Sequence, residues 1–293
     1  MNNPLISIII PTYGGPNLLS RALDSILNQT LKEWEVLVVD DNGKGLPNQL
    51  LTENAIKPYL LDERIHYLVH EVNKNGSAAR NTGFRQSLGK YIALFDDDDE
   101  YLPIFLQSQM LCLEKQNPDC GMVYCSYEQY FEGEKQRTVH ALKKGWLLYD
   151  TLMHSFEIPT SSWLIKREVF SELGGFDESF YRHQDWEFLN RLAAKYQIQA
   201  NDTVCYKRHI GFRNSPKNPE QFIAYRKHYL EKMDGVIILL QPKERKHVLI
   251  SNQIDAIIPL LKTKQFFRFI KEFISIRPGL YGIKFLINRL FKL

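Results

Sequence analysis

The chain has 293 residues and a net charge of +3 at pH 7, enough length for one large domain with an extension. Its four cysteines (Cys112, Cys120, Cys125 and Cys205) form no C-x-x-C pair, which excludes a small disulfide framework and favours reduced thiols. The first strand is predicted within ten residues of the N-terminus, and no run of 18 apolar residues occurs, so we expect neither a signal peptide nor a membrane-spanning helix.

Buried strands alternate with helices in the first hundred residues. Four short apolar runs predict strands at residues 5–10, 35–39, 65–69 and 91–95. Apolar residues at helical spacing follow the first of them at 18–27, and a second helix is expected from residue 75 to about residue 88. This alternation predicts a mostly parallel sheet with helices on both faces.

Polar clusters follow three of the four strands. They are Pro11-Thr12-Tyr13, Asp40-Asp41 and the acidic run Asp96 to Glu100. The carboxyl ends of parallel strands meet at one edge of a sheet, where ligands bind, so we expect these side chains to lie together. Adjacent carboxylates repel one another, and a hard divalent cation shared with substrate phosphates would relieve that repulsion. A solvated acidic turn is the alternative interpretation of the run by itself.

Other nucleotide or metal motifs fail on spacing. Counted from Asp96, a calcium-binding EF-hand needs Gly at the sixth position and Glu at the twelfth, where the chain has Tyr101 and Gln107. The chain has no G-x-x-x-x-G-K-[ST] loop, and the glycines after the first strand lack the G-x-G-x-x-G spacing of a dehydrogenase.

A second group of elements lies between residues 160 and 210. A strand is predicted at 160–165, a short helix at 167–173, and an amphipathic helix that opens at 183–187. Asp185 falls in the first turn of that helix, where the helix dipole stabilises a carboxylate. Taken alone, Asp185 is therefore an ordinary acid at a helix N-terminus.

Four motifs occur in a specific order: I-I-I-P-T-Y at 8–13, V-V-D-D-N at 38–42, N-G-S-A-A-R-N at 75–81 and F-D-D-D-D-E-Y-L-P at 95–103. Together they resemble the nucleotide-diphospho-sugar transferases of the GT-A fold, glycosyltransferase family 2, over residues 5–210. The resemblance implies an α/β, Rossmann-like, mostly parallel sheet flanked by helices. It also implies a nucleoside-diphosphate sugar as donor, with a UDP-sugar favoured.

The resemblance assigns roles to particular residues. The expected nucleotide-sugar-binding residues are Pro11, Thr12, Tyr13, Asp40, Asp41, Arg80 and Asp97. The family's D-x-D pattern fits Asp96 and Asp98, so these are the expected ligands of Mn²⁺ or Mg²⁺. His209, after a later strand, is expected to complete the metal shell or to meet the diphosphate; a surface or packing role is the alternative. Arg208 or Arg213 would meet phosphate oxygens.

The family also shows G-G-F-D-E and then an acidic pair before Trp, whose second acid is the general base. Asp185 occupies that position, and Gln184 stands where Glu is common. The resemblance thus implies a metal-dependent, inverting glycosyltransferase of cell-surface polysaccharide or lipopolysaccharide biosynthesis, acting on a glycan or lipid-linked acceptor. A nucleotidyltransferase or a non-catalytic nucleotide-sugar binder is the alternative. The first would need a basic residue in the loop 13–17, which has none, and the second would not need Asp185.

Three regions are expected: a nucleotide-sugar-binding half at 1–110, an acceptor-binding and catalytic half at 111–215, and a helical C-terminal extension at 216–293. Residues 264–293 combine many apolar side chains with seven basic ones and one acid, Glu272. The basic residues are Lys264, Arg268, Lys271, Arg277, Lys284, Arg289 and Lys292.

Basic, aromatic-rich amphipathic helices bind anionic membranes, so this tail predicts peripheral contact with the inner face of the cell membrane and a cytoplasmic location. Pro278-Gly279 is expected to divide the tail into two helices. The alternative is a helical pair that packs on the domain or on another subunit. No nucleic-acid recognition module accompanies the basic residues, so we expect no nucleic-acid partner.

Overall fold

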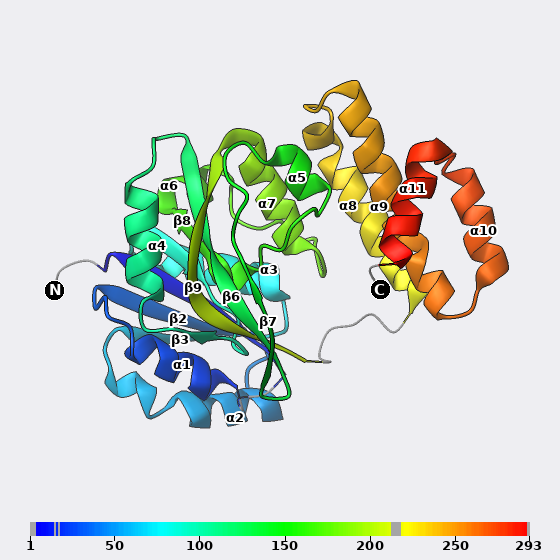
Figure 1. Ribbon diagram of the computed structural model, residues 1–293. Coiled ribbons are helices and arrows are strands. Elements are labelled where there is room, and N and C mark those ends of the chain that lie inside the picture. The colour runs from blue at the N-terminus through cyan, green and yellow to red at the C-terminus, as the bar shows by residue number, and fades with distance from the viewer. Residues whose placement is uncertain (1–3, 15, 17, 212–217, 292–293) are drawn as a thin grey trace.

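The computed structural model describes residues 4–14, 16, 18–211 and 218–291. Within these residues one sheet contains nine strands in the order β3-β2-β1-β4-β8-β6-β9-β5, with β7 paired to β6 (Figure 1). The strands are β1 (Ile6–Thr12), β2 (Trp34–Asp40), β3 (Ile65–Val69), β4 (Tyr91–Leu94), β5 (Glu100–Tyr101), β6 (Cys120–Phe131), β7 (Glu134–Val139), β8 (Trp163–Lys166) and β9 (Gln197–Ile210).

The predicted fold class is confirmed, and the sheet is mixed. Strands β1 to β4 pair in parallel, as expected. Strand β8 then joins β4 in the antiparallel direction, β6 joins β8 likewise, and β9 runs parallel to β6. The antiparallel part includes the β6–β7 hairpin, whose two-residue turn, Glu132-Gly133, has positive φ at both positions as a type I′ turn requires.

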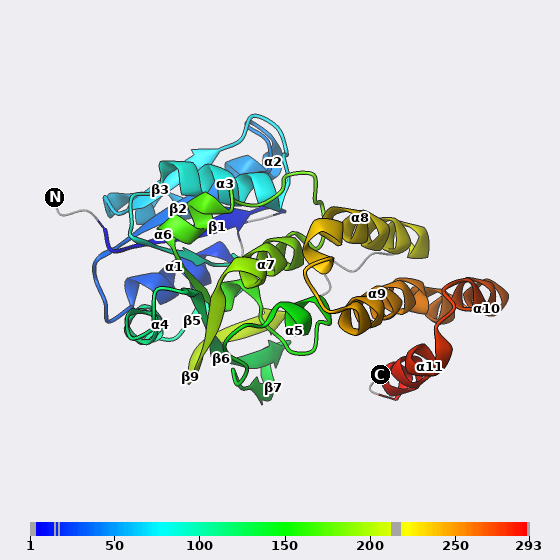
Figure 2. The same ribbon diagram turned by 90° about the horizontal axis from the view of Figure 1, so that it is seen from above.

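Helices cover both faces of this sheet (Figures 1 and 2). The α-helices are α1 (Leu19–Leu27), α2 (Pro47–Ile56), α3 (Gly76–Gln86), α4 (Phe105–Glu114), α5 (Leu148–Leu152), α6 (Arg167–Glu172), α7 (Gln184–Lys195), α8 (Pro219–Ile237), α9 (Pro242–Lys262), α10 (Phe266–Ser275) and α11 (Gly279–Leu290). Two short 3₁₀ turns are η1 (Tyr59–Leu61) and η2 (Thr160–Ser162), so the strand expected at 160–165 begins only at Trp163.

Successive side chains of β1 point to opposite faces of the sheet, and the core has a layer on each face. Ile8 and Ile10 pack with α1 and α4 in one buried cluster, whereas Ile9 packs with α6 and α7 in the other. Full burial of each such side chain contributes about 1.5–3 kcal/mol, so both layers hold β1 in place. Helix α3 lies close against β1, because a Cβ at Gly83 would come within 2.5 Å of Ile9. The ends of β1, β2 and β4 are thereby fixed at a common edge.

The C-terminal extension stands at one end of the α/β part (Figure 2). Helix α8 packs on α7, and α9 packs between α8 and the last two helices. The predicted break at Pro278-Gly279 is confirmed, since α10 ends at Ser275 and α11 begins at Gly279. Among the described helices, none combines the length and the apolar character needed to cross a membrane.

A buried charge network joins the extension to the α/β part. Arg226 of α8 is 2% exposed, donates to Asn252 Oδ1 at 2.6 Å, and lies 3.7 Å from Asp255 Oδ2. Its guanidinium group sits over the ring of Trp186 in α7, 4.5 Å from the ring centroid. Asp255 also receives a 3.0 Å hydrogen bond from Arg289 Nε of α11. Asp255 thus balances two cations, one of them fully buried.

Replacing Asp255 with Ala is expected to lower the free energy of unfolding by roughly 3–5 kcal/mol, because a buried cation loses its counter-charge. Denaturant titration followed by circular dichroism measures the change. Glu71→Ala is the matched control, since its ion pair with Lys44 is solvent-exposed and is expected to contribute less than about 1 kcal/mol. Equal unfolding midpoints for the two variants would contradict the structural role of Asp255.

Candidate active site

A cleft of about 910 Å³ opens at the carboxyl ends of β1, β2 and β4. Residues from these strand ends and from the start of α3 form one side. The segment before α7, the first turn of α7, the end of β9 and one residue of α8 form the other. The lining residues are Pro11, Thr12, Tyr13, Gly14, Asp41, Asn73, Asn75, Gly76, Ala79, Arg80, Asp96, Asp97, Asp98, Thr160, Tyr181, Arg182, His183, Gln184, Asp185, Trp186, Arg208 and Phe222.

The first two carboxylates of the acidic run after β4 accept hydrogen bonds from different residues. Asp96 accepts a 2.7 Å charge-assisted hydrogen bond from Arg80 Nη2 and a 3.1 Å bond from Thr160 Oγ1. Asp97 is buried and accepts a 2.6 Å hydrogen bond from Thr12 Oγ1 at the end of β1. These bonds tie the acidic run to β1, to α3 and to the η2 turn.

Asp98 and Asp99 face different environments. Asp99 is buried and accepts the backbone N–H of His209 at 3.0 Å. Burial raises the pKa of Asp99 well above its ordinary value, and the charges of Asp98 and Asp96 add to the rise. Asp98 instead lines the cleft and is partly exposed, while its backbone carbonyl accepts a hydrogen bond from Arg21. Asp98 therefore borders the space in which a ligand would lie.

This donor set fits a metal ion that is only partly coordinated by protein. Within the described residues, no group of three or more His, Cys, Asp or Glu side chains is arranged to hold a metal. Mg²⁺ commonly binds through one or two carboxylates and completes its shell with water and substrate phosphates. Asp98 offers such an oxygen ligand, and Asp96 lies beside it with one of its oxygens bonded to Arg80.

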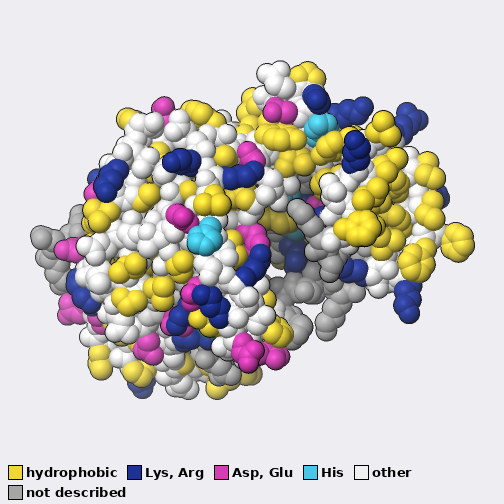
Figure 3. All heavy atoms as spheres, in the orientation of Figure 1, with side chains coloured by type: hydrophobic (Ala, Val, Ile, Leu, Met, Phe, Trp, Pro, Cys, Tyr) yellow, Lys and Arg dark blue, Asp and Glu magenta, His cyan; other side chains and the backbone are white. Residues whose placement is uncertain are grey.

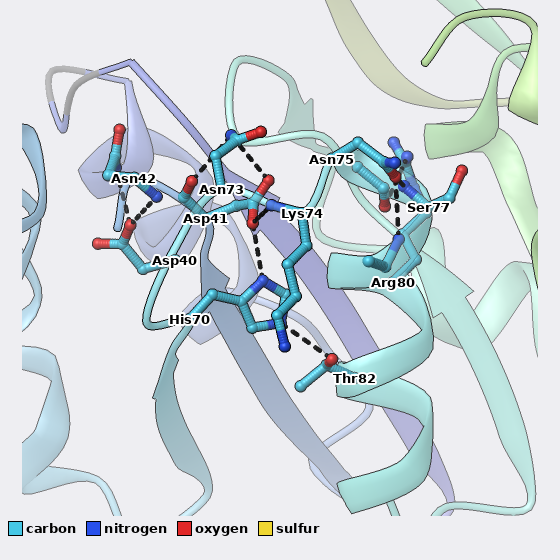
Figure 4. Close-up of polar contacts among 12 residues, drawn as sticks. Asp40, Asp41, Asn42, His70, Asn73, Lys74, Asn75, Ser77, Arg80 and Thr82 are labelled. Carbon is cyan, nitrogen blue, oxygen red and sulfur yellow. Dashed lines mark hydrogen bonds and ion pairs between the residues drawn. The ribbon is translucent and has the colours of Figure 1, made fainter. Parts of the chain in front are cut away.

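Asp40 and Asp41 at the end of β2 occupy different positions (Figure 4). Asp40 is buried and does not line the cleft; its oxygens accept bonds from Tyr67 OH at 2.6 Å and from the backbone and side-chain nitrogens of Asn42, each at 2.8 Å. Asn42 Oδ1 in turn accepts the N–H of Gly14. Asp40 therefore shapes the loop after β1 from behind the cleft.

Asp41 lines the cleft and fixes the loop before α3. Its Oδ1 accepts bonds from His70 Nδ1 and from the backbone N–H of Lys74, each at 2.7 Å, and its Oδ2 accepts a 3.0 Å bond from Asn73 Nδ2. His70 Nε2 also contacts Thr82 Oγ1 of α3 at 3.0 Å. Figure 4 shows the His70 and Asn73 side chains converging on this carboxylate. Asp41 thus joins the end of β2 to α3.

The start of α3 brings Arg80 into the cleft. Asn75 caps the helix by accepting the backbone N–H of Ser77 at 2.9 Å, and it adopts a positive φ of 80° to do so. The next residue, Gly76, leaves space for two cleft side chains, since a Cβ there would lie 3.1 Å from Arg80 Nη1 and 3.6 Å from Gln184 Nε2. Gln184 thus reaches across the cleft to the helix that holds Arg80.

Pro11, Thr12 and Tyr13 form the wall at the end of β1. The Tyr13 side chain is 63% exposed at the rim, so its ring is available to a planar ligand. Thr12 is buried and engaged with Asp97. Pro11, Tyr13 and Asp41 thus line the cleft together, and their role at a nucleotide base stays a prediction.

Asp185 enters the cleft from the first turn of α7. His183, the residue at the helix N-cap, has a left-handed φ of 65°, which turns the chain so that Gln184 and Asp185 both reach the cleft. Burial raises the pKa of the Asp185 carboxyl above its ordinary value. The charge of Asp96 adds to the rise, whereas the N–H of Trp186 and the charge of Arg80 oppose it. A carboxylate with a raised pKa accepts a proton more readily.

Three residues singled out from the sequence lie at or beyond the end of β9. Arg208 lines the cleft, and the neighbouring carboxylate of Glu157 lies 4.0 Å from its Nη1. The side chain of His209 does not line it; its Nε2 lies 3.5 Å from Glu100 Oε2, and its ring packs near Tyr130. Arg213 lies outside the described residues.

Some cleft residues were not predicted. Phe222 of α8 and Tyr181 before α7 line the cleft, and Phe222 packs edge-on against the His183 ring at 5.9 Å. Thr160 lies in the η2 turn and bonds Asp96. Only tertiary packing brings these residues to the cleft, so no local sequence pattern marks them. For the segment Asn73 to Gly76 the sequence does carry a signal, because Asn is a favoured N-cap residue and Asn75 stands at the start of a predicted helix.

Residues 7–174 match the model of the family described as Glycosyl transferase family 2. The matched segment begins in β1, ends after α6 and contains all of the predicted cleft residues up to Asp98. The chain therefore belongs to glycosyl transferase family 2, and the predicted family is confirmed.

Curated proteins with similar sequences are named as glycosyltransferases. An uncharacterized glycosyltransferase of Rickettsia prowazekii is 34% identical over 216 residues, which cover 71% of this chain and 64% of that protein. The chain thus spans just under two thirds of that relative. A putative colanic acid biosynthesis glycosyl transferase of Escherichia coli, WcaA, is 28% identical over 78% of this chain and 82% of its own length. The Escherichia coli glucosyltransferase WfgD, named for UDP-Glc and a GlcNAc-diphosphoundecaprenol, is 33% identical over 44% of this chain and 47% of its own.

Solved structures share the fold. Staphylococcus aureus TarS, residues 1–349, superposes with a TM-score of 0.66 at 16% identity, covering 93% of this chain and 81% of that one. The same TarS segment was solved in complex with UDP-GlcNAc. The Pyrobaculum calidifontis mannosyltransferase PcManGT, solved with GDP-Man and Mn²⁺, gives a TM-score of 0.58 at 19% identity, covering 99% and 88% of the two chains. At these identities the likeness confirms the fold, including the C-terminal helices.

Proposed function

We propose that the protein is a metal-dependent, inverting glycosyltransferase that moves a sugar from a nucleoside-diphosphate donor to an acceptor hydroxyl. The observation that supports this most strongly is the placement of Asp185 in the same cleft as Asp98 and Arg80, although they come from opposite walls. A protein that only binds a nucleotide sugar has no use for a partly buried carboxylate of raised pKa opposite the acidic run.

The donor end of the cleft is the wall built by β1, β2 and α3. The base would lie against Tyr13 and next to Asp41, and Arg80 would face the diphosphate. UDP is the favoured nucleotide, which the names of WfgD and of the TarS complex support, whereas the PcManGT complex shows that GDP occurs on this fold. Glycan or lipid-linked acceptors in surface polysaccharide or lipopolysaccharide biosynthesis are proposed on the names of WcaA and WfgD.

Asp185 supplies the base for the transfer. The acceptor hydroxyl is a weak nucleophile until its proton is taken, and general-base help contributes about 10²–10⁴-fold. In this proposal Asp185 accepts that proton while the hydroxyl oxygen bonds to the anomeric carbon and the diphosphate leaves with the bonding electrons. Because the base lies on the wall opposite the donor phosphates, a single displacement inverts the anomeric centre.

The departing diphosphate gains negative charge on the side of the acidic run. Bound Mn²⁺ or Mg²⁺ would neutralise that charge as a Lewis acid. Asp98 is the residue that would hold the ion, with Asp96 beside it. Arg80 stays near the phosphates because its bond to Asp96 and the cap at Asn75 fix the position of its guanidinium group.

Replacing Asp185 with Asn is expected to lower kcat by roughly 10²-fold or more and to leave donor affinity nearly unchanged, because the amide cannot accept the proton.

The raised pKa of Asp185 also predicts a pH dependence. The kcat/KM of the wild type is expected to fall as the pH drops through a value above the pKa of an ordinary Asp, since protonation removes the base. Product formation from a panel of nucleotide sugars measures both effects. The control is Asp202→Asn, at an exposed position of β9 outside the cleft. Wild-type turnover by Asp185→Asn would assign the base elsewhere.

The metal proposal is tested by binding rather than by turnover. Calorimetric titration with UDP is expected to show tighter binding with Mn²⁺ than with chelator. Asp98→Asn is expected to weaken the Mn²⁺-dependent binding about ten- to hundredfold, the loss typical of one charged contact. Asp202→Asn again serves as control, and thermal melts show whether each variant is folded. UDP affinity that is equal with Mn²⁺ and with chelator would remove the metal from the proposal.

A further inference from the structure

The outer face of α10 and α11, which we call the tail face, exposes large apolar side chains. Figure 3 shows hydrophobic side chains gathered over these two helices, with Lys and Arg around their margin. Phe267 is 90% exposed and Leu280 is 79% exposed. The apolar residues exposed on these helices are Phe266, Phe267, Ile270, Ile274, Leu280, Ile283, Ile287 and Leu290, and Phe291 follows them.

The tail face is separate from the face by which these helices pack on the protein. Phe269 of α10 is buried in a cluster with Leu260 of α9. On α11, Gly282 is buried, and a Cβ there would lie 3.0 Å from Ile250 of α9. Both helices are thus apolar on two sides, and only the inner side is covered by the chain. Exposed apolar patches of this kind mark interaction sites in soluble proteins.

Basic side chains lie within the tail face and at its ends. Lys271 is four residues after Phe267 and three before Ile274, which places it on the same side of α10. Lys284 has the same relation to Leu280 and Ile287 on α11. Lys262, Lys264 and Arg277 lie next to the helix ends and are also exposed. Across the described residues, these five cations form no ion pair within 4.0 Å, unlike Arg268 and Arg289.

We propose that the tail face docks on an anionic lipid bilayer, with α10 and α11 lying flat in the headgroup region. The apolar side chains would enter the acyl boundary, and the lysines would extend their charged ends to lipid phosphates. A second copy of the chain is less suited to this surface, because it would bring the same cations face to face. At ten and twelve residues the two helices are about 15–18 Å long, which suits shallow insertion rather than crossing.

Sedimentation of the full-length protein with phospholipid vesicles tests this proposal. We expect binding to vesicles with about one third phosphatidylglycerol, at least tenfold weaker binding to pure phosphatidylcholine, and loss of binding in high salt. Each basic residue near an anionic surface strengthens partitioning about fivefold, so Lys271→Glu/Lys284→Glu is expected to weaken it at least twentyfold. Phe267→Ser/Ile274→Ser removes apolar side chains without changing the net charge, and we expect this variant also to bind the vesicles more weakly.

Matched controls distinguish binding through the tail face from nonspecific electrostatic and hydrophobic binding by the rest of the protein. Lys57→Glu/Lys115→Glu makes the same charge change at exposed lysines of the α/β part and is expected to leave binding within about fivefold of wild type. Leu61→Ser changes a side chain that is 88% exposed, close to the value for Phe267. Equal losses for tail-face and control variants would overturn the proposal, as would absence of binding to the anionic vesicles. Light scattering that shows a dimer broken by Phe267→Ser/Ile274→Ser would assign the face to a second copy.

Discussion

Repulsion among the carboxylates that follow β4 is the constraint on which the cleft depends. Within this run Asp96 accepts a hydrogen bond from Arg80, Asp97 accepts one from Thr12, and Asp99 accepts the backbone N–H of His209. These donors belong to three different elements, so the hydrogen bonds join α3, β1 and β9 around the run, and Arg80 is the donor among them that carries a positive charge. Asp98 remains at the cleft surface, where a cation and a diphosphate would complete the balance of charge.

The two walls of the cleft meet through a few specific contacts. Gln184 approaches Gly76 from the opposite side, and Asn75 Nδ2 donates to the carbonyl of Glu178 at 2.9 Å. The C-terminal extension takes part as well, since Phe222 lines the cleft and Arg226 supports Trp186 from behind. The extension is therefore part of the architecture around Asp185, and the buried Asp255 network determines how firmly it is held.

The sequence predicted the parallel strands and the clusters at their ends, because each strand is a short apolar run followed directly by polar residues. It did not predict that Asp40 and Asp41 diverge: both are buried at the end of β2, and the side-chain partners Tyr67 and His70 distinguish the carboxylate behind the cleft from the one that lines it. The Glu132-Gly133 turn was missed because Glu is unusual at a position of positive φ. Phe222 could not be placed, since helix α8 reaches the cleft only through packing on α7. The roles of His209 and Asp96 at a metal stay predictions, and the structure engages Asp96 with Arg80 and Thr160.

We propose that one cleft holds both the donor nucleotide and the catalytic base. A crystal structure of the protein grown with UDP and Mn²⁺ tests it most directly. We expect the uracil ring against Tyr13 and beside Asp41, the diphosphate between Arg80 and Asp98, and open space between the terminal phosphate and Asp185. A nucleotide bound outside this cleft, or one whose phosphates contact Asp185 in place of Asp98, would contradict it.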